Sequence, residues 1–248
     1  MIGPFDMKSL YTLLLVLTGI GFGTTALAED LKGWGHFGGS SYGTRYSSSA
    51  HITPANVKDL QVAWRYSTGE VQRRGETLMA NSSTETTPIL VDGSLMFCTP
   101  FNRIVALDPE TGKERWVHDP QVSLDQKMPY QYNCRGVTAW SDPQAQAGAA
   151  CATRIFMGTN DNRVIAVDSR TGRRCEDFGQ GGEVKVLRDW PDEFPGESKL
   201  MSAPIVASGV VAVGCFIMDN LRAHAPPGTV FAFDARTGKP AWKFEPIP

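Results

Sequence analysis

The feature that most constrains this sequence is a short phrase that occurs three times. Its skeleton is Ala-x-Asp-x-x-Thr-Gly-Lys/Arg, and the three copies begin at Ala106, Ala166 and Ala232. The aspartates of successive copies lie 60 and 66 residues apart, which indicates a repeat with loop insertions. A period of this length is typical of stacked supersecondary units.

Each copy of the phrase is predicted to form the turn of a β-hairpin. Its Asp can accept hydrogen bonds from N–H groups of the turn, and its Gly supplies the positive φ that a short bulged hairpin needs. Two apolar, β-rich runs precede each turn, at residues 95–98 and 103–107, 154–157 and 163–167, and 210–213 and 229–233. We therefore expect each unit to be a small antiparallel sheet, and sheets of this kind arranged radially make a β-propeller.

A tryptophan follows the first and third copies at the same distance. Trp116 and Trp242 stand ten residues after the Ala of their copies, whereas the second copy has Glu176 at that position. A large flat side chain on the returning strand can fill the seam against the next sheet. The repeats are therefore expected to dock through tryptophan.

Composition agrees with a globular, all-β chain. The 248 residues are 42% apolar and 20% charged, and a net charge of −2 gives no basic footprint for nucleic acid. Helical periodicity is nowhere convincing. We expect sheet units within residues 84–118, 153–178 and 203–244, a further strand at residues 60–66, an insertion at 119–150 and a loop at 179–202.

The N-terminus is predicted to be a cleaved signal peptide covering residues 1–28. Lys8 precedes an apolar run at residues 10–20, and Ala26-Leu27-Ala28 fits the small-x-small cleavage rule. The run is shorter than the roughly 20 residues that span a bilayer, so an uncleaved anchor is the less favoured alternative. Export to the periplasm follows, with an extended lead-in at residues 29–58 and a partial propeller at 59–248.

Export allows disulfides among the five cysteines. Their spacing fits no zinc pattern, and an odd number leaves at least one outside any pairing. Cys151 and Cys175 flank one hairpin and are a candidate pair. The sequence leaves the connectivity open.

Several motifs in order resemble one family. They are the segment from Trp34 to Ser47, residues 60–69, Glu85-Thr-Thr-Pro-Ile89, Cys134-Arg-Gly136, Gly158-Thr-Asn-Asp161 and the three repeats. Together they resemble the pyrroloquinoline-quinone (PQQ) dependent dehydrogenases, in particular the glucose/quinate/shikimate branch. The resemblance implies an eight-bladed propeller with the quinone on its axis, of which this chain would form the N-terminal three to four blades.

The resemblance also implies a site. PQQ is a flat ortho-quinone with three carboxylates, so it needs cations, hydrogen-bond donors and a metal that polarises the reactive carbonyl. Glu85 matches a quinone-contacting Glu, Arg135 an Arg that pairs with the quinone, and Thr159 a Thr that bonds a carboxylate. Asp219 and Asn220 match oxygen ligands of Ca²⁺ or Mg²⁺.

Each of these residues also has a plain structural interpretation. Glu85 can cap a strand, Arg135 and Thr159 suit ordinary turns, and Asp219-Asn220 is a common loop pair. Their joint order favours the functional interpretation. Phe101 stands where glucose-type members usually carry His, which weakens the assignment to glucose. The catalytic base of the family is expected beyond Pro248, so no catalytic residue is assigned.

The resemblance implies a periplasmic dehydrogenase that oxidises a sugar, polyol or cyclic alcohol by hydride transfer to PQQ. Electrons would pass to the respiratory quinone pool, with association at the membrane surface, and the 248-residue chain alone is expected to be inactive. The alternatives are a non-catalytic propeller scaffold and a truncated product with bare sheet faces and edges. The retained site residues argue against the scaffold.

Overall fold

The computed structural model of the chain describes residues 34–40, 42–124, 130–186, 194 and 196–246. The predicted signal peptide and the first residues of the lead-in lie outside this part of the chain. In the described part, no helix is long and apolar enough to cross a bilayer.

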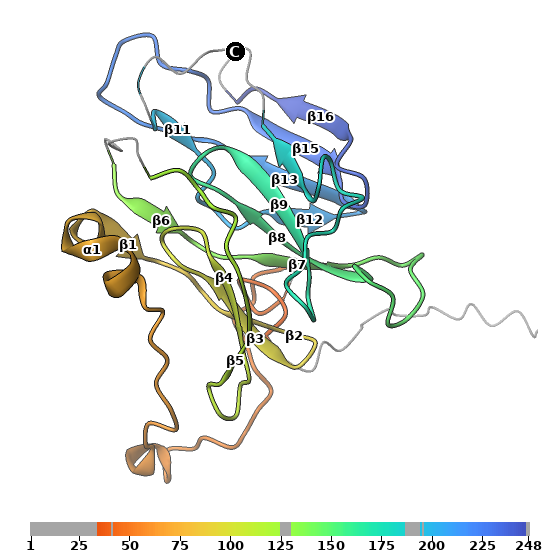
Figure 1. The fold of residues 1–248 in the computed structure, drawn as a ribbon. Coiled ribbons are helices and arrows are strands. Elements are labelled where there is room, and N and C mark those ends of the chain that lie inside the picture. The colour runs from red at the N-terminus through yellow and green to blue at the C-terminus, as the bar shows by residue number, and fades with distance from the viewer. Residues whose placement is uncertain (1–33, 41, 125–129, 187–193, 195, 247–248) are drawn as a thin grey trace, which may run out of the picture. The chain divides into compact units, whose positions relative to one another are not determined.

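Three four-stranded antiparallel sheets follow one another along the chain, and most of their strands are consecutive in sequence (Figure 1). The first sheet consists of β2 (Ile89–Val91), β3 (Ser94–Cys98), β4 (Ile104–Leu107) and β5 (Glu114–His118). The second consists of β7 (Thr138–Ser141), β8 (Thr153–Gly158), β9 (Arg163–Asp168) and β10 (Glu183–Lys185). The third consists of β12 (Ile205–Ala207), β13 (Val210–Gly214), β15 (Val230–Asp234) and β16 (Pro240–Phe244). The prediction of a β fold built from three repeated sheets is confirmed.

Two short strand pairs complete the β structure. Strand β1 (Ser82–Thr84) runs parallel to β6 (Tyr132–Cys134), and β11 (Ser198–Lys199) pairs antiparallel with β14 (Phe216–Ile217). The insertion at residues 119–150 and the loop at 179–202 therefore hold strands that the sequence did not reveal. These strands are only two to four residues long, which is too short for an alternating pattern to show.

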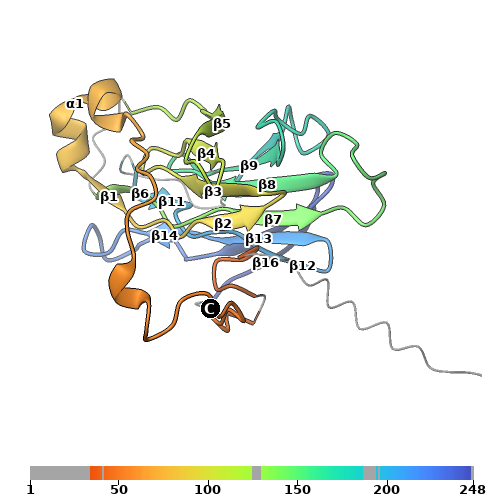
Figure 2. The ribbon, with the colours of Figure 1, turned by 90° about the horizontal axis from the view of Figure 1, so that it is seen from below.

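The chain also forms a helix, α1 (Glu70–Ala80), where no helix was expected, besides a 3₁₀ turn at Val57–Asp59. Gly75 breaks the helical φ/ψ in its middle, and Glu70 is its one fully buried residue. The helix therefore has no continuous apolar stripe for a periodicity search to find. Figure 2 shows α1 beside β1 and β6, as Figure 1 does.

The three repeated phrases form one turn. In the first, Oδ1 of Asp108 accepts hydrogen bonds from the N–H of Glu110 (3.1 Å) and from the N–H and hydroxyl of Thr111 (2.9 Å each). Asp168 and Asp234 accept the same three bonds in their own turns. The glycine after each Thr has φ of 68–69°, as the hairpin prediction requires.

Tryptophan docks one unit on the next at this turn. A Cβ on Gly172 would lie 2.5 Å from the Trp116 ring, and the indole N–H of Trp116 donates to the Ser169 carbonyl at 3.1 Å. Trp64 makes the equivalent contacts with Gly112 and with the Pro109 carbonyl. The predicted docking is confirmed for Trp116, and Trp64, for which only a strand was predicted, docks in the same way.

Residues 60–66 are the exception to the strand predictions. Trp64 of this segment docks as a returning strand would place it, but the segment pairs with no strand of the described chain. Val62 is 67% exposed. A strand needs a hydrogen-bonded neighbour, and no described strand pairs with residues 60–66, so the prediction of a strand here is wrong for the described chain.

Backbone replaces tryptophan between the second and third sheets. The turn of the third repeat contacts the chain just after Glu176. There the Gly179 N–H donates to the Thr237 carbonyl at 2.9 Å. The backbones are so close that a Cβ on Gly238 would lie 2.6 Å from the Gly179 nitrogen. The outer strand of the second sheet is accordingly supplied by β10, further along the chain. Trp242, the tryptophan of the third repeat, lies on β16 and is 50% exposed.

The apolar core lies between successive sheets. One cluster joins the first two sheets and includes Met96, Trp116, Ile155 and Met157. A second joins the next two and includes Phe156, Phe178, Val211 and Phe233. Successive sheets therefore bury the faces that they turn towards each other, as expected for a repeat of this kind.

Substitution of Gly172 tests the tryptophan dock. Gly172→Ala is expected to cost about 1–2 kcal/mol for a left-handed backbone and about 1–3 kcal/mol more for overpacking against Trp116. Gly209 also has a positive φ, of 75°, but a Cβ on it would meet nothing within 4 Å, so Gly209→Ala should show the backbone cost alone. Urea unfolding measures both, and equal losses would contradict the dock.

Acid should weaken the first turn. Hydrogen bonds from Arg115 and then Thr111 lower the pKa of Asp108 from 3.8 to about 2. Because the folded pKa is depressed, its contribution is present above pH 4 and is lost as the pH falls towards 2. Asp108→Asn should flatten the loss of unfolding free energy between pH 4 and 2, and an unchanged slope would contradict this assignment.

Candidate functional site

The strand register places the predicted site residues at one end of the sheets. The connections after Cys98, Gly158 and Gly214 lie at the end opposite the three Asp turns, since these residues pair with Ile104, Val164 and Val230. The chain enters each sheet at this same end, because the first strand of each unit is antiparallel to the second. The segments that carry the predicted residues thus converge.

Glu85 and Arg135 form the centre of the site. Nε of Arg135 donates to Oε2 of Glu85 at 2.8 Å, and Nδ2 of Asn133 lies 3.3 Å from the same oxygen. The Arg135 hydrogen bond holds the pKa of Glu85 below its usual value. The Arg135 side chain is 51% exposed, and within the described residues its terminal amino groups make no hydrogen bond. The two terminal amino groups of a cation are therefore accessible.

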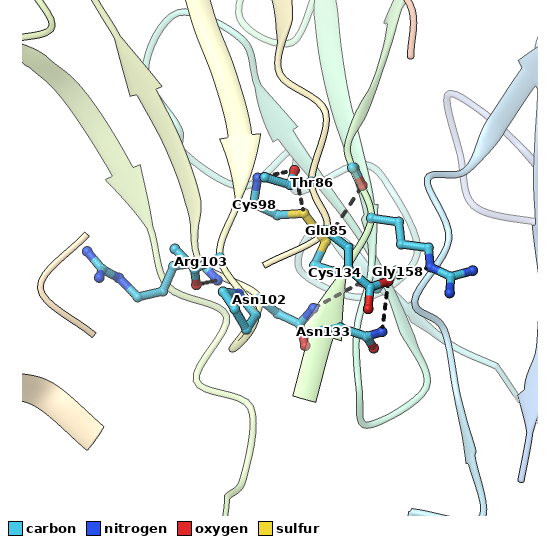
Figure 3. The surroundings of a disulfide bond; sticks show 12 residues. Glu85, Thr86, Cys98, Asn102, Arg103, Asn133, Cys134 and Gly158 are labelled. Atoms are coloured by element: carbon cyan, nitrogen blue, oxygen red, sulfur yellow. Dashed lines mark hydrogen bonds and ion pairs between the residues drawn. A yellow bond between two sulfur atoms is a disulfide. The ribbon is translucent and has the colours of Figure 1, made fainter. Parts of the chain in front are cut away.

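A disulfide fastens the segment that carries Arg135 to β3, beside the segment that carries Glu85 (Figure 3). It joins Cys98 at the end of β3 to Cys134, next to Arg135. The Thr86 hydroxyl, next to Glu85, lies 3.5 Å from the Cys98 sulfur and accepts the Cys98 N–H at 3.4 Å. The Arg135 N–H in turn donates to the Met201 carbonyl at 2.8 Å.

The second disulfide is the candidate pair Cys151 and Cys175, now confirmed. It lies within the second unit and does not include a site residue. Cys215 belongs to neither disulfide.

Thr159 is buried in a turn of its own. Its hydroxyl donates to Asp161 and accepts the Arg163 N–H at 2.9 Å. Thr99 accepts the Arg103 N–H at 3.2 Å in the matching turn of the first sheet, so Thr-x-x-Asn-Arg is a second repeated phrase that the sequence analysis missed. The structure gives the Thr159 hydroxyl a structural role, and its contact with a cofactor stays a prediction.

Asp219 and Asn220 lie in an exposed loop directly after β14. The loop is pinned to β11, because the Met218 N–H donates to the Glu197 carbonyl at 2.8 Å and Arg222 binds the Glu197 carboxylate at 2.7 and 3.1 Å. Within the described chain, no hydrogen bond joins Asp219 or Asn220 to the pair of Glu85 and Arg135. Two oxygen ligands are fewer than the six to eight that Ca²⁺ takes, so these two residues alone do not make a calcium site.

The described residues contain no group of three or more His, Cys, Asp and Glu side chains that could hold a metal ion. The metal prediction at Asp219 and Asn220 therefore stays a prediction.

Phe101 is 1% exposed. Its ring lies 5.2 Å from the Tyr132 ring, and Leu78 and Met79 of α1 pack against this pair. Arg74 of α1 lies over the Phe101 ring at 5.6 Å. Phe101 thus anchors the helix.

The strand β11 was missed by the sequence analysis although it connects the site. Its Lys199 is fully buried, and the next two residues bond Thr159 and Arg135 through the backbone. No repeat or motif marks residues 197–201, so only the fold reveals them.

Repeated four-stranded sheets docked by tryptophan define the class of a β-propeller repeat. The chain belongs to the PQQ family described as "Glucose/ethanol/alcohol dehydrogenase, beta-propeller domain", whose family model matches residues 34–248.

Named relatives agree. The chain is 39% identical over 212 residues to the glycerol dehydrogenase large subunit of Gluconobacter oxydans (strain 621H), covering 86% of this chain and 28% of that one. It is 33% identical to the quinate/shikimate dehydrogenase (quinone) of Acinetobacter baylyi, covering 88% and 28%, and 31% identical to quinoprotein glucose dehydrogenase A of Acinetobacter calcoaceticus, covering 86% and 28%. The chain thus spans 28% of the length of these relatives.

Solved structures show the same fold. The quinohemoprotein alcohol dehydrogenase from Comamonas testosteroni matches with a TM-score of 0.67 and 27% identity, over 87% of this chain and 27% of that one. A europium-containing methanol dehydrogenase matches with a TM-score of 0.64 at 24% identity, over 86% and 32%, and supports the fold alone.

Removal of each disulfide should separate stability from site geometry. The pairs enclose 36 and 24 residues, so Cys98→Ala/Cys134→Ala and Cys151→Ala/Cys175→Ala should each cost about 3–4 kcal/mol. Only the first should also lose hydrogen-exchange protection at the Arg135 amide, because it releases β6 from β3. Equal protection in both variants would contradict the fastening role.

Proposed function

We propose that this chain supplies the carboxylate-binding part of a periplasmic, PQQ-dependent dehydrogenase that oxidises a sugar, polyol or cyclic alcohol. The observation that carries the proposal is the ion pair of Glu85 and Arg135, which leaves two guanidinium donors accessible beside the disulfide. The named activities of the relatives, on glycerol, glucose and quinate or shikimate, support this substrate class.

The residues fit PQQ in charge and geometry. Arg135 offers a planar pair of donors that suits a carboxylate or a quinone edge. Glu85 holds Nε of Arg135, so the guanidinium keeps one orientation when a ligand arrives. Fixing the donors beforehand lowers the entropic cost of binding.

When bound, PQQ supplies the acceptor for the hydride that leaves the alcohol carbon. The described residues bind and orient this acceptor. Glu85 is ionised at neutral pH, and Arg135 lowers the pKa of its carboxyl further, so Glu85 accepts rather than donates hydrogen bonds at the site. The base that takes the alcohol proton is not assigned to any described residue.

A Ca²⁺ or Mg²⁺ ion would be held by Asp219 and Asn220, whose carboxylate and amide oxygens are ligands of hard cations. The bidentate bond of Arg222 to Glu197 keeps this loop against β11, beside the segment that bonds Arg135. Further ligands would come from the cofactor carboxylates and water.

We propose that electrons pass to the respiratory quinone pool at the membrane surface.

Substitution of Arg135 tests the proposal in the complete protein. Loss of a charge-assisted hydrogen bond costs about 1.5–3 kcal/mol, so Arg135→Ala should weaken PQQ binding about 10- to 100-fold. Arg115→Ala is the matched control, since Arg115 forms a similarly exposed ion pair with Asp108 at the opposite end. Titration calorimetry measures both, and PQQ binding that is absent in the wild type, or unaffected by Arg135→Ala, would refute the assignment.

A further inference from the structure

Lys199 is a buried cation that the proposed function does not use. Its residue is 0% exposed, and its ammonium group donates to the Gln131 carbonyl. The ammonium nitrogen lies 5.5 Å from the centroid of the Tyr130 ring and 5.3 Å from that of the Phe216 ring. A buried ammonium held by one carbonyl and two aromatic faces is only partly compensated.

No carboxylate of the described residues lies within ion-pair distance of Lys199. The charges that act on it are those of Glu85 and Arg135, which neutralise each other at 2.8 Å. The neighbouring Glu197 is bound by Arg222, and Tyr130 is the remaining titratable group against it. Among these groups, Lys199 is therefore the buried cation that has no carboxylate partner in the described residues.

A buried charge without an ion-pair partner is costly to the folded protein. Burial, and secondarily Arg135, lower the pKa of Lys199 from 10.5 to about 8, while Glu85 opposes the shift. Removing a buried, incompletely paired charge is often neutral or stabilising. Groups with such cost concentrate at functional sites, where a ligand compensates them.

We propose that Lys199 is the positioning cation of this site, whose charge draws the carboxylates of an anionic ligand towards Arg135. The inference rests on the proposed function. Because the ammonium is buried, Lys199 acts through its electrostatic potential. It also acts through its hydrogen bond to the carbonyl of Gln131, the residue that precedes β6 and Arg135. Direct contact with the ligand is left to the exposed Arg135.

Calorimetric titration of PQQ into the complete protein between pH 7 and 9 tests this role. The ligand carboxylates stay ionised over this range, so affinity should fall as the pH rises through about 8 and Lys199 loses its proton. Lys199→Met should bind about tenfold more weakly at pH 7, without this pH dependence. Lys199→Arg, which stays charged, should bind tightly at both ends of the range.

Lys239→Met serves as the control, because Lys239 is exposed in the third Asp turn at the opposite end. Unfolding by urea adds a second readout, in which Lys199→Met should keep or raise the midpoint of the ligand-free protein at pH 7.

Wild-type and Lys199→Met proteins that bind PQQ equally, or with the same pH profile, would overturn the inference alone. Equally weak binding by Lys199→Arg and Lys199→Met would overturn it too, since charge would then not matter. A wild-type protein that binds no PQQ would overturn the proposed function, and this inference with it.

Discussion

The structure depends on the contact between a tryptophan ring and a glycine in a left-handed turn. Trp64 and Trp116 each lie where a Cβ on the opposing glycine would stand, and each indole donates to a carbonyl of the same turn. The contact sets both the spacing and the rotation between units, because a flat ring stacked on a backbone leaves little freedom to slide. Apolar faces then bury against each other in register.

The strand register decides at which end of the sheets the candidate binding residues lie. With the Asp turns confined to one end, the connections of variable length lie at the other, and loops on a rigid scaffold are where binding residues gather. Glu85 and Arg135 come from segments 50 residues apart, yet parallel pairing of β1 with β6 and the disulfide of Cys98 and Cys134 bring them into contact.

The sequence predicted the repeated sheets well, because an Asp-x-x-Thr-Gly turn has a local mechanism. It also placed Glu85 and Arg135 in the site through the resemblance to a family. It could not predict α1, whose apolar residues Leu78 and Met79 find their partners only in Phe101 and Tyr132. Lys199 was missed for a similar reason, since its significance comes from burial and from the charges of distant residues.

The two disulfides differ in what must happen before they can close. Cys151 and Cys175 both belong to the second unit, so their thiols can meet as soon as that hairpin forms. Cys98 meets Cys134 only after the first sheet has met the strand that enters the second. In an oxidising compartment, the order in which the two disulfides form would therefore follow the order in which the units assemble. The disulfide of Cys98 and Cys134 would form last and fix the candidate site in place.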